Sequence, residues 1–270
     1  YEDLVVAAEW GPISVFANSK GRLTLTKAES LNNQAGWWNT IASGDFDNDG
    51  DVDMVAGNLG LNSKLKADFD NPVRMYVNDF DKNGTIEPIL THVIGGLEYP
   101  FYTRDEMTKQ LPSLKKKYLS YGKFAKAEFK DFFPKETIRN SQKYSATMFE
   151  SVYIENLGNF VFKYKSLPKQ IQFSTANAFE IRDFNNDNNL DVLVGGNFFR
   201  SNIQMGRYDA NFGELLLGDG RGNFKCVGRS TVGISLRGQI SKVLPISIGK
   251  NRYELVIVND DSVKLLKIIQ

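Results

Sequence analysis

Three nine-residue segments with one spacing of acidic residues constrain the fold of this chain more than any other feature. They read "DFDNDGDVD" from residue 45, "DFDKNGTIE" from residue 79 and "DFNNDNNLD" from residue 183. Each follows a run with strand-like alternation and precedes a short apolar run rich in β-branched side chains. This order predicts a strand, a tight nine-residue loop and a second strand, repeated along the chain.

A second kind of hairpin recurs beside these loops. Residues 13–26, 151–164 and 214–227 each hold two alternating runs joined by a turn rich in Gly and Asn. Two hairpins in succession give a four-stranded meander, and repeated meanders in one chain are typical of a β-propeller. We therefore predict an all-β fold over residues 1–270, a β-propeller of four-stranded blades with four or five blades represented.

The two ends of the chain follow the same repeat. Residues 2–10, "EDLVVAAEW", align with residues 52–60, "VDMVAGNLG", when Asp3 takes the place of Asp53. On this alignment we expect the first blade to lack its leading strand and the chain to be a fragment of a longer protein. Residues 240–269 keep the strand rhythm, but "GKNR" stands where the acidic loop would be.

Residues from about 101 to 148 interrupt the pattern. They lack period-two alternation and are rich in Lys, Glu and Ala, with eleven Lys or Arg and five Asp or Glu. We predict two or three short helices here, inserted between strands of a middle blade.

The acidic loops have the composition of a site for a hard cation. Short oxygen-bearing side chains alternate at positions 1, 3 and 5, position 6 is a residue type that tolerates a left-handed backbone, and an acid closes the loop at position 9. Ligation by oxygen alone, without His or Cys, favours Ca²⁺ over zinc or copper. The predicted ligands, with the position 7 carbonyl included, are Asp45, Asp47, Asp49, Asp51 and Asp53; Asp79, Asp81, Asn83, Thr85 and Glu87; and Asp183, Asn185, Asp187, Asn189 and Asp191.

These loops differ from EF-hands and from one another. Position 12 holds Ala56, Leu90 and Val194 instead of a bidentate Glu, and strands flank the loops instead of helices. The first loop offers the most carboxylates, so we expect it to bind Ca²⁺ most tightly, and the third, without Gly at position 6, to be the one left empty. The alternative is that Asp, Asn and Gly are here only because they favour turns.

The net charge and the numbers of each residue type make several classes of function less favourable for this chain. A formal net charge of +1 gives no global field to attract nucleic acid, and no apolar run reaches the roughly 18 residues of a membrane span. His92 is the only histidine, which leaves little for a catalytic triad or a catalytic zinc site. Carboxylate pairs are abundant, so a carbohydrate-active enzyme stays open as an alternative.

The repeats resemble a known family. "ASGDFDNDGDVDMVAGN" and "EIRDFNNDNNLDVLVGGN" are similar to FG-GAP/VCBS repeats, the calcium-binding propeller blades of integrin α-subunits and many bacterial surface proteins. Across nearly the whole chain, segments such as "AGNLGLNSK" and "YPFYTRDEMTKQLPSLKKK" resemble the C-terminal region of bacterial ASPIC/UnbV-type proteins related to cartilage acidic protein. The resemblance implies a propeller, calcium in the acidic loops, and export to the periplasm or cell surface.

Two functions follow as expectations. The first is a non-enzymatic, calcium-stabilised binding or scaffold module of an exported protein, whose protein or glycan ligand is unknown. The second is part of a carbohydrate-active enzyme, because calcium propellers occur among polysaccharide lyases. The second requires a basic and aromatic pocket, which the insert could supply with Arg104, Lys109 or Lys115.

Overall fold

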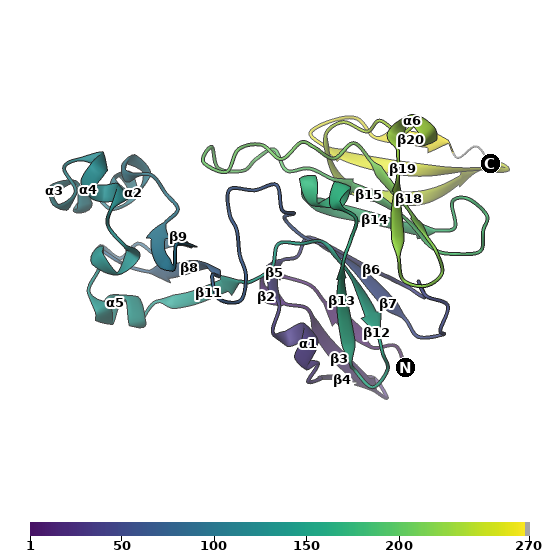
Figure 1. Cartoon of the computed structure of the whole chain (residues 1–270), viewed down its shortest axis with the longest axis horizontal. Helices are drawn as coiled ribbons and strands as arrows, with labels where there is room; N and C mark the ends of the chain where they lie inside the picture. Colours follow the sequence, from purple (N-terminus) through teal and green to yellow (C-terminus); the bar gives the residue numbers. More distant parts are fainter. Residues whose placement is uncertain (268–270) are drawn as a thin grey trace. The chain divides into compact units, whose positions relative to one another are not determined.

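A computed structural model describes residues 1–267, and the described chain is mostly β-strand. Its contacts separate two compact units. The first comprises Tyr1–Lys64 and Phe149–Gln270, and the second comprises Leu65–Met148. Figure 1 labels the elements of both units.

Two four-stranded antiparallel sheets form the centre of the first unit. One has the order β13-β12-β7-β6 and the other the order β14-β15-β16-β17. The strands are β6 (Thr40–Gly44), β7 (Asp53–Gly57), β12 (Val152–Asn156), β13 (Phe162–Ser166), β14 (Ala176–Arg182), β15 (Asp191–Gly196), β16 (Glu214–Gly218) and β17 (Phe224–Val227). Each sheet is a meander in chain order, which is the strand order predicted for a propeller blade.

Smaller sheets complete the first unit. The orders are β1-β3-β4, β18-β19-β20 and β2-β5. Their strands are β1 (Leu4–Val6), β2 (Glu9–Pro12), β3 (Ser14–Ser19), β4 (Arg22–Leu25), β5 (Ala35–Trp37), β18 (Gln239–Ile248), β19 (Asn251–Asn259) and β20 (Lys264–Lys267). Short helical turns are α1 (Glu29–Asn32), η2 (Lys169–Phe173) and α6 (Arg229–Val232). The three predicted hairpins are confirmed as β3–β4, β12–β13 and β16–β17.

The sheets of the first unit pack against one another in series. One core lies between the β6–β13 and β14–β17 sheets and includes Phe46, Val55, Tyr153 and Val192. A second core, with Leu193 and Val256, joins the β14–β17 sheet to β18–β20. The first strands of successive sheets, β6, β14 and β18, contact one another in this order. Burial of these apolar faces supplies the main driving force for stacking the sheets.

The second unit is a sheet with the order β10-β9-β8-β11 and a group of short helices. Its strands are β8 (Val73–Asn78), β9 (Glu87–Ile94), β10 (Leu97–Pro100) and β11 (Gln142–Ala146). Its helices are α2 (Arg104–Gln110), α3 (Leu114–Lys117), α4 (Tyr121–Ala125), η1 (Phe129–Asp131) and α5 (Lys135–Arg139). Two or three short helices were predicted in residues 101–148, and the structure has four together with the 3-10 turn η1. The unit also begins earlier and takes in the second acidic loop with β8 and β9.

Packing explains why the second acidic loop belongs to this unit. Tyr76 of β8 and Ile89 of β9 share a core with Met107, Leu111 and other apolar residues of the helical segment. Meanwhile β7 pairs with β12, so the hairpin at 151–164 completes the sheet that carries the first loop. The local pattern of a strand, loop and strand is therefore the same in both units, while long-range packing decides which strands join it.

Candidate metal centre

All three acidic loops share an unusual backbone. Positions 4 and 6 both adopt positive φ, whereas the sequence pointed only to position 6. The φ angles are 61° for Asn48, 61° for Lys82 and 63° for Asn186 at position 4, and 94° for Gly50, 87° for Gly84 and 68° for Asn188 at position 6. Gly and Asn carry the smallest cost in this region, so Lys82 is the one residue there whose type does not favour it.

The same hydrogen bonds fold each loop. The amide of position 6 donates to the carboxylate of position 1, and the amide of position 7 donates to the side chain of position 5. These bonds are Gly50 N to Asp45 Oδ2 and Asp51 N to Asp49 Oδ1; Gly84 N to Asp79 Oδ2 and Thr85 N to Asn83 Oδ1; and Asn188 N to Asp183 Oδ2 and Asn189 N to Asp187 Oδ1. The side chains at positions 1 and 5 are thereby drawn toward the inside of the loop.

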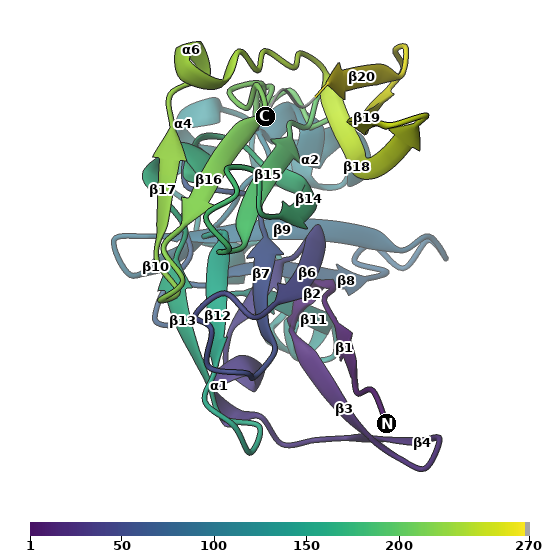
Figure 2. The same cartoon turned by 90° about the vertical axis from the view of Figure 1, so that its right-hand side faces the viewer.

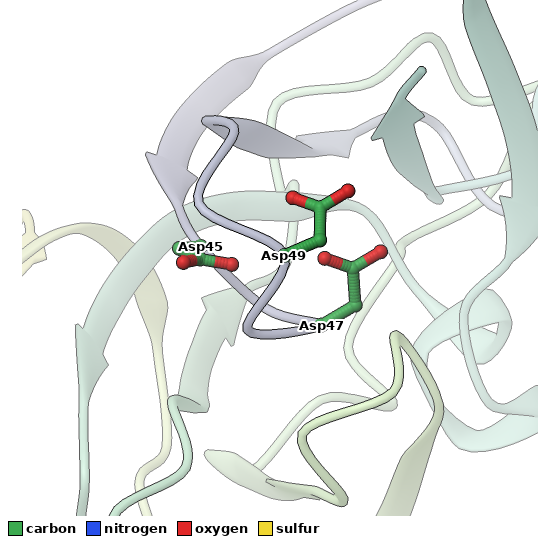
Figure 3. A group of neighbouring side chains, drawn as sticks. All are labelled: Asp45, Asp47 and Asp49. Carbon is green, nitrogen blue, oxygen red and sulfur yellow. The ribbon is translucent and has the colours of Figure 1, made fainter. Parts of the chain in front are cut away.

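The first loop, between β6 and β7, gathers three carboxylates. Oxygens of Asp45, Asp47 and Asp49 all lie within 4.8 Å of one another, and Figure 3 shows the three side chains on this loop. The Oδ1 atoms of Asp45 and Asp47 are buried and have no hydrogen-bond partner. Burial, followed by the charges of Asp53 and Asp49, raises the pKa of Asp47. Buried oxygens without donors and mutually repelling carboxylates are the features that a bound cation would satisfy.

The second loop, between β8 and β9, gathers a different trio. Oxygens of Asp79, Asp81 and Glu87 lie within 4.8 Å of one another. The backbone N–H of Asn83 at position 5 donates to Asp79 Oδ1 at 3.0 Å and to Asp81 Oδ1 at 3.2 Å. Glu87 reaches the cluster from position 9 because its side chain is one methylene longer than the aspartates at that position of the other loops. Three carboxylates with oxygen ligands nearby again suit a hard cation.

In the third loop, between β14 and β15, side chains of the loop hydrogen-bond to one another. Asn185 at position 3 donates Nδ2 to Asp187 Oδ2 at 2.9 Å and accepts from the Asp187 amide at 3.0 Å. These amide contacts, with the Asn185 side chain contributing most, lower the pKa of Asp187. Among residues 1–267, the groups of acids close enough to share an ion fall in the first two loops and not in this one. The carboxylates of Asp183 and Asp187 therefore already accept amide hydrogen bonds from within the loop.

The closing aspartates of the first and third loops bind protein groups. Asp53 is fully buried, and it accepts from the amides of Phe46 and Asn156 and from Tyr153 Oη at 2.7 Å. Burial raises the pKa of Asp53 despite these donors. The sequence predicted Asp53 as a ligand, and that stays a prediction; in the structure its hydrogen bonds tie the first loop to β12. Tyr153 and Asn156 were not identified from sequence, and their place in the β12–β13 hairpin was the available signal.

Asp191 has the corresponding position in the third loop. Its oxygens accept from the amides of Phe184 at 2.8 Å and Gly218 at 2.9 Å, and it too is fully buried. Burial raises its pKa as well. No side-chain hydroxyl joins it, because Leu215 stands in β16 where Tyr153 stands in β12.

Loops one and three touch within the first unit. Asn48 Nδ2 donates to Asn189 Oδ1 at 3.1 Å, and the amide of Gly222 in the β16–β17 turn donates to the Phe46 carbonyl at 3.2 Å. A Cβ on Gly222 would come within 2.8 Å of the Tyr153 ring. The glycine-rich turn "DGRGN" is therefore explained by the close approach of the first loop.

Two residues that a catalytic site would have to use, His92 and Arg104, contact neighbouring side chains and backbone. Burial lowers the pKa of His92, and its ring meets the edge of Phe101 at 5.4 Å. Arg104 donates Nε to the Tyr118 carbonyl, pairs with Asp105 and lies over the Tyr121 ring. Arg104 is therefore engaged by residues of its own helical segment.

Comparison with known proteins supports the repeat family at one end of the chain. A family model described as an FG-GAP-like repeat matches residues 1–56. The match includes the first acidic loop whole and ends within β7. A search of curated proteins found no match to this chain. In the described part of the chain, every helix is too short or too polar to cross a membrane.

Proposed function

We propose that this chain is a non-enzymatic binding or scaffold module whose first two acidic loops hold Ca²⁺. The observation that carries the proposal is the pair of buried Oδ1 atoms on Asp45 and Asp47 that lack any donor. A fully buried acceptor without a partner costs about 1–3 kcal/mol; Asp45 and Asp47 are only partly buried, so the cost here is smaller, and a bound cation would offset it.

The protein supplies the cage, and the ion supplies charge. Oxygens for the ion come from the side chains of Asp45 and Asp47 in the first loop and of Asn83 in the second. Backbone amides of the loops hold Asp45 and Asn83 in place. Bound Ca²⁺ would neutralise the converging carboxylates and link the two strands that each loop connects. Because a formed site exists only in the folded chain, binding stabilises the fold by mass action.

Architecture, family and location belong to the same proposal. We take the serial sheets of the first unit as blades of a propeller, and the FG-GAP-like match over residues 1–56 supports this. Kinship with the ASPIC/UnbV-type proteins and export to the periplasm or cell surface follow from the resemblance of the sequence to those proteins. A protein or glycan ligand fits a module of this kind, and near-neutral charge argues against nucleic acid.

Bound calcium per chain, measured with thermal melts before and after chelation, tests the proposal. We expect about two ions per chain, one for each carboxylate trio, and a clear drop in melting temperature on chelation. An unchanged melt and no bound ion would show that the aspartates are turn formers alone.

A further inference from the structure

The helical part of the second unit has a lysine-rich surface. Residues 111–127, "LPSLKKKYLSYGKFAKA", hold five lysines and no acid. They form α3, α4 and the turns beside them, next to α2, as Figure 1 shows, and Figure 2 labels α2 and α4 after a turn of 90°. Four of these lysines are exposed and form no ion pair within the part of the chain that the structure describes: Lys115, Lys116, Lys123 and Lys126. Their charge is therefore available to a partner.

The nearest acids in the sequence are occupied within the unit. Before the lysines, Glu106 closes the capping box of α2, and Asp105 pairs with Arg104 at 3.2 Å. After them, Glu128 pairs with Lys130 at 2.6 Å. These contacts leave the charge of the four lysines unbalanced by a neighbouring acid. Their field therefore extends into solvent over a Debye length, about 10 Å at 0.1 M salt.

Two large side chains are exposed among the lysines. Leu119, in the turn between α3 and α4, is 79% exposed, and Tyr121, the first residue of α4, is 62% exposed. Contacts with α2 fix the position of the tyrosine, because Tyr121 Oη donates to Asp105 Oδ2 at 2.8 Å and the Arg104 guanidinium lies 5.1 Å from the ring centroid. Tyr118 is buried in the core of the unit. The segment therefore keeps one aromatic ring in the core and leaves Leu119 and Tyr121 in solvent.

Exposure of an apolar side chain is by itself no sign of a binding surface, and the same unit contains the counterexample. Phe69 is 77% exposed, nearly as much as Leu119, but its neighbours in the sequence are Asp68 and Asp70. Single exposed apolar residues of this kind are common on proteins. What distinguishes Leu119 is that the charged side chains around it in the sequence are cationic.

A bilayer surface with anionic lipids is the partner that matches both features. Lysine ammonium groups are attracted to the anionic headgroups, while a leucine can leave water for the acyl boundary and a tyrosine suits the headgroup level. An acidic polysaccharide would meet the same lysines but would leave Leu119 in water. The exposed leucine therefore favours the lipid surface over the polysaccharide.

We propose that α3, α4 and the turn between them bind peripherally to membranes that contain anionic lipids. Leu119 enters the interface, Tyr121 lies at the headgroups, and the four lysines meet lipid phosphates and carboxylates. The binding is reversible, because a single apolar side chain with a basic patch falls far short of the buried area of a spanning helix. This inference goes beyond the calcium scaffold and does not depend on ions in the acidic loops.

Co-sedimentation of the whole chain with vesicles tests the proposal. One set of vesicles is phosphatidylcholine alone, and the other contains about 30% phosphatidylserine. We expect the partition coefficient to be at least tenfold higher for the anionic vesicles at 0.1 M salt, and most of that difference to disappear at about 0.5 M salt, because screening weakens the attraction of the lysines.

Two matched double variants locate the basic contact. Lys115→Ala with Lys116→Ala should lower the partition coefficient about 25-fold, because each lysine near an anionic surface contributes about fivefold. Lys135→Ala with Arg139→Ala removes the same charge from α5, where Glu136 also lies, and should leave binding within about twofold.

Two single variants test the apolar contact in the same way. Leu119→Ser should weaken binding to anionic vesicles about fivefold, because less apolar surface leaves water on binding. Phe69→Ser removes an equally exposed apolar side chain from an acidic setting and should change nothing. Circular dichroism and thermal melts check that every variant is folded.

Several outcomes would overturn the proposal. These are equal binding to both kinds of vesicle, an equal loss in the α3 and α5 double variants, or an equal effect of Leu119→Ser and Phe69→Ser. Binding to immobilised heparin without binding to vesicles would assign the lysines to an acidic polysaccharide instead. Calcium content and chelation melts are read separately, so failure of vesicle binding with an intact calcium response would remove the lipid surface and leave the calcium scaffold standing.

Discussion

The first and third acidic loops occupy the same place in neighbouring sheets but differ in how the charges of their clustered carboxylates are balanced. Both bend through left-handed residues at positions 4 and 6 and bury an aspartate at position 9. The first loop has Asp47 at position 3, where the third has Asn185. One amide in place of one carboxylate removes a charge from the third loop and supplies an internal donor to Asp187.

The contrast separates the shape of these loops from the number of their oxygens that lack a donor. Backbone amides hold both loops in the same conformation, because position 6 donates to position 1 in each. What differs is whether buried oxygens remain without donors, as in Asp45 and Asp47. The number of unsatisfied oxygens, more than the motif itself, should therefore decide where Ca²⁺ binds.

Chelation should separate the two loops most strongly. Removing Ca²⁺ leaves like charges and orphaned oxygens in the first loop, whereas the third keeps its internal bonds. We expect amide exchange across residues 45–52 to speed up at least tenfold with chelator, and exchange across residues 183–190 to stay within about twofold. Hydrogen exchange read by mass spectrometry measures both in one sample. Equal acceleration in the two loops would contradict the comparison.

Exchanging the position 3 residues should move the site. Asp47→Asn gives the first loop the donor of the third, and we expect Ca²⁺ affinity there to fall by roughly 10- to 100-fold, because ligand charge tunes affinity. The reciprocal Asn185→Asp should give the third loop a measurable site. Calorimetric titration of each variant counts the ions. Unchanged stoichiometry in both variants would show that position 3 does not decide occupancy.

The tyrosine at the first loop should contribute stability that the third loop lacks. Tyr153 Oη donates to the buried Asp53, whereas Leu215 takes that place beside Asp191. Tyr153→Phe removes a hydrogen bond to a charged acceptor, and we expect the free energy of unfolding to fall by about 1.5–3 kcal/mol. Urea unfolding with Ca²⁺ present measures it. Leu215→Met, a volume-conserving change without any such bond, should cost under about 1.5 kcal/mol.

The sequence predicted the local parts of this molecule well because those parts depend on neighbouring residues. The loops, the three hairpins and the equivalence of Asp3 with Asp53 all follow from short-range pattern, and the structure contains each of them. The partners of a strand depend on distant residues. The sequence around β8 and β9 does not indicate that these strands belong to the second unit. They do so because they pack against Met107 and Leu111, which lie further along the chain.

The candidate site shows the same limit on a smaller scale. Ligand types at positions 1, 3 and 5 are visible in the sequence, and the structure brings Asp45, Asp47 and Asp49 together. The role of position 9 is not visible, because it depends on which donors the next strand supplies. Asp53 meets Tyr153 and Asn156, while Glu87 joins its cluster and accepts the Phe80 amide. A carboxylate's neighbours, and hence its availability to an ion, come from tertiary structure.

The smallest expected effect is an opposite response of the two loops to pH when Ca²⁺ is absent. Burial and neighbouring carboxylates raise the pKa of Asp47 in the folded state. Ionisation of Asp47 therefore destabilises the fold. The stability that the protonated form contributes is fully present below the unfolded-state pKa and is lost as pH rises through the folded-state pKa. The Asn185 contact lowers the pKa of Asp187, so the stability it contributes is present above the unfolded pKa and is lost as pH falls through the folded value.

In calcium-free buffer, Asp47→Asn should become more stabilising relative to wild type as pH rises through the acidic range, and Asp187→Asn should become more destabilising. Urea unfolding of both variants across that range measures the two slopes, and slopes of the same sign would show that the two loops do not differ in the way their hydrogen bonds indicate.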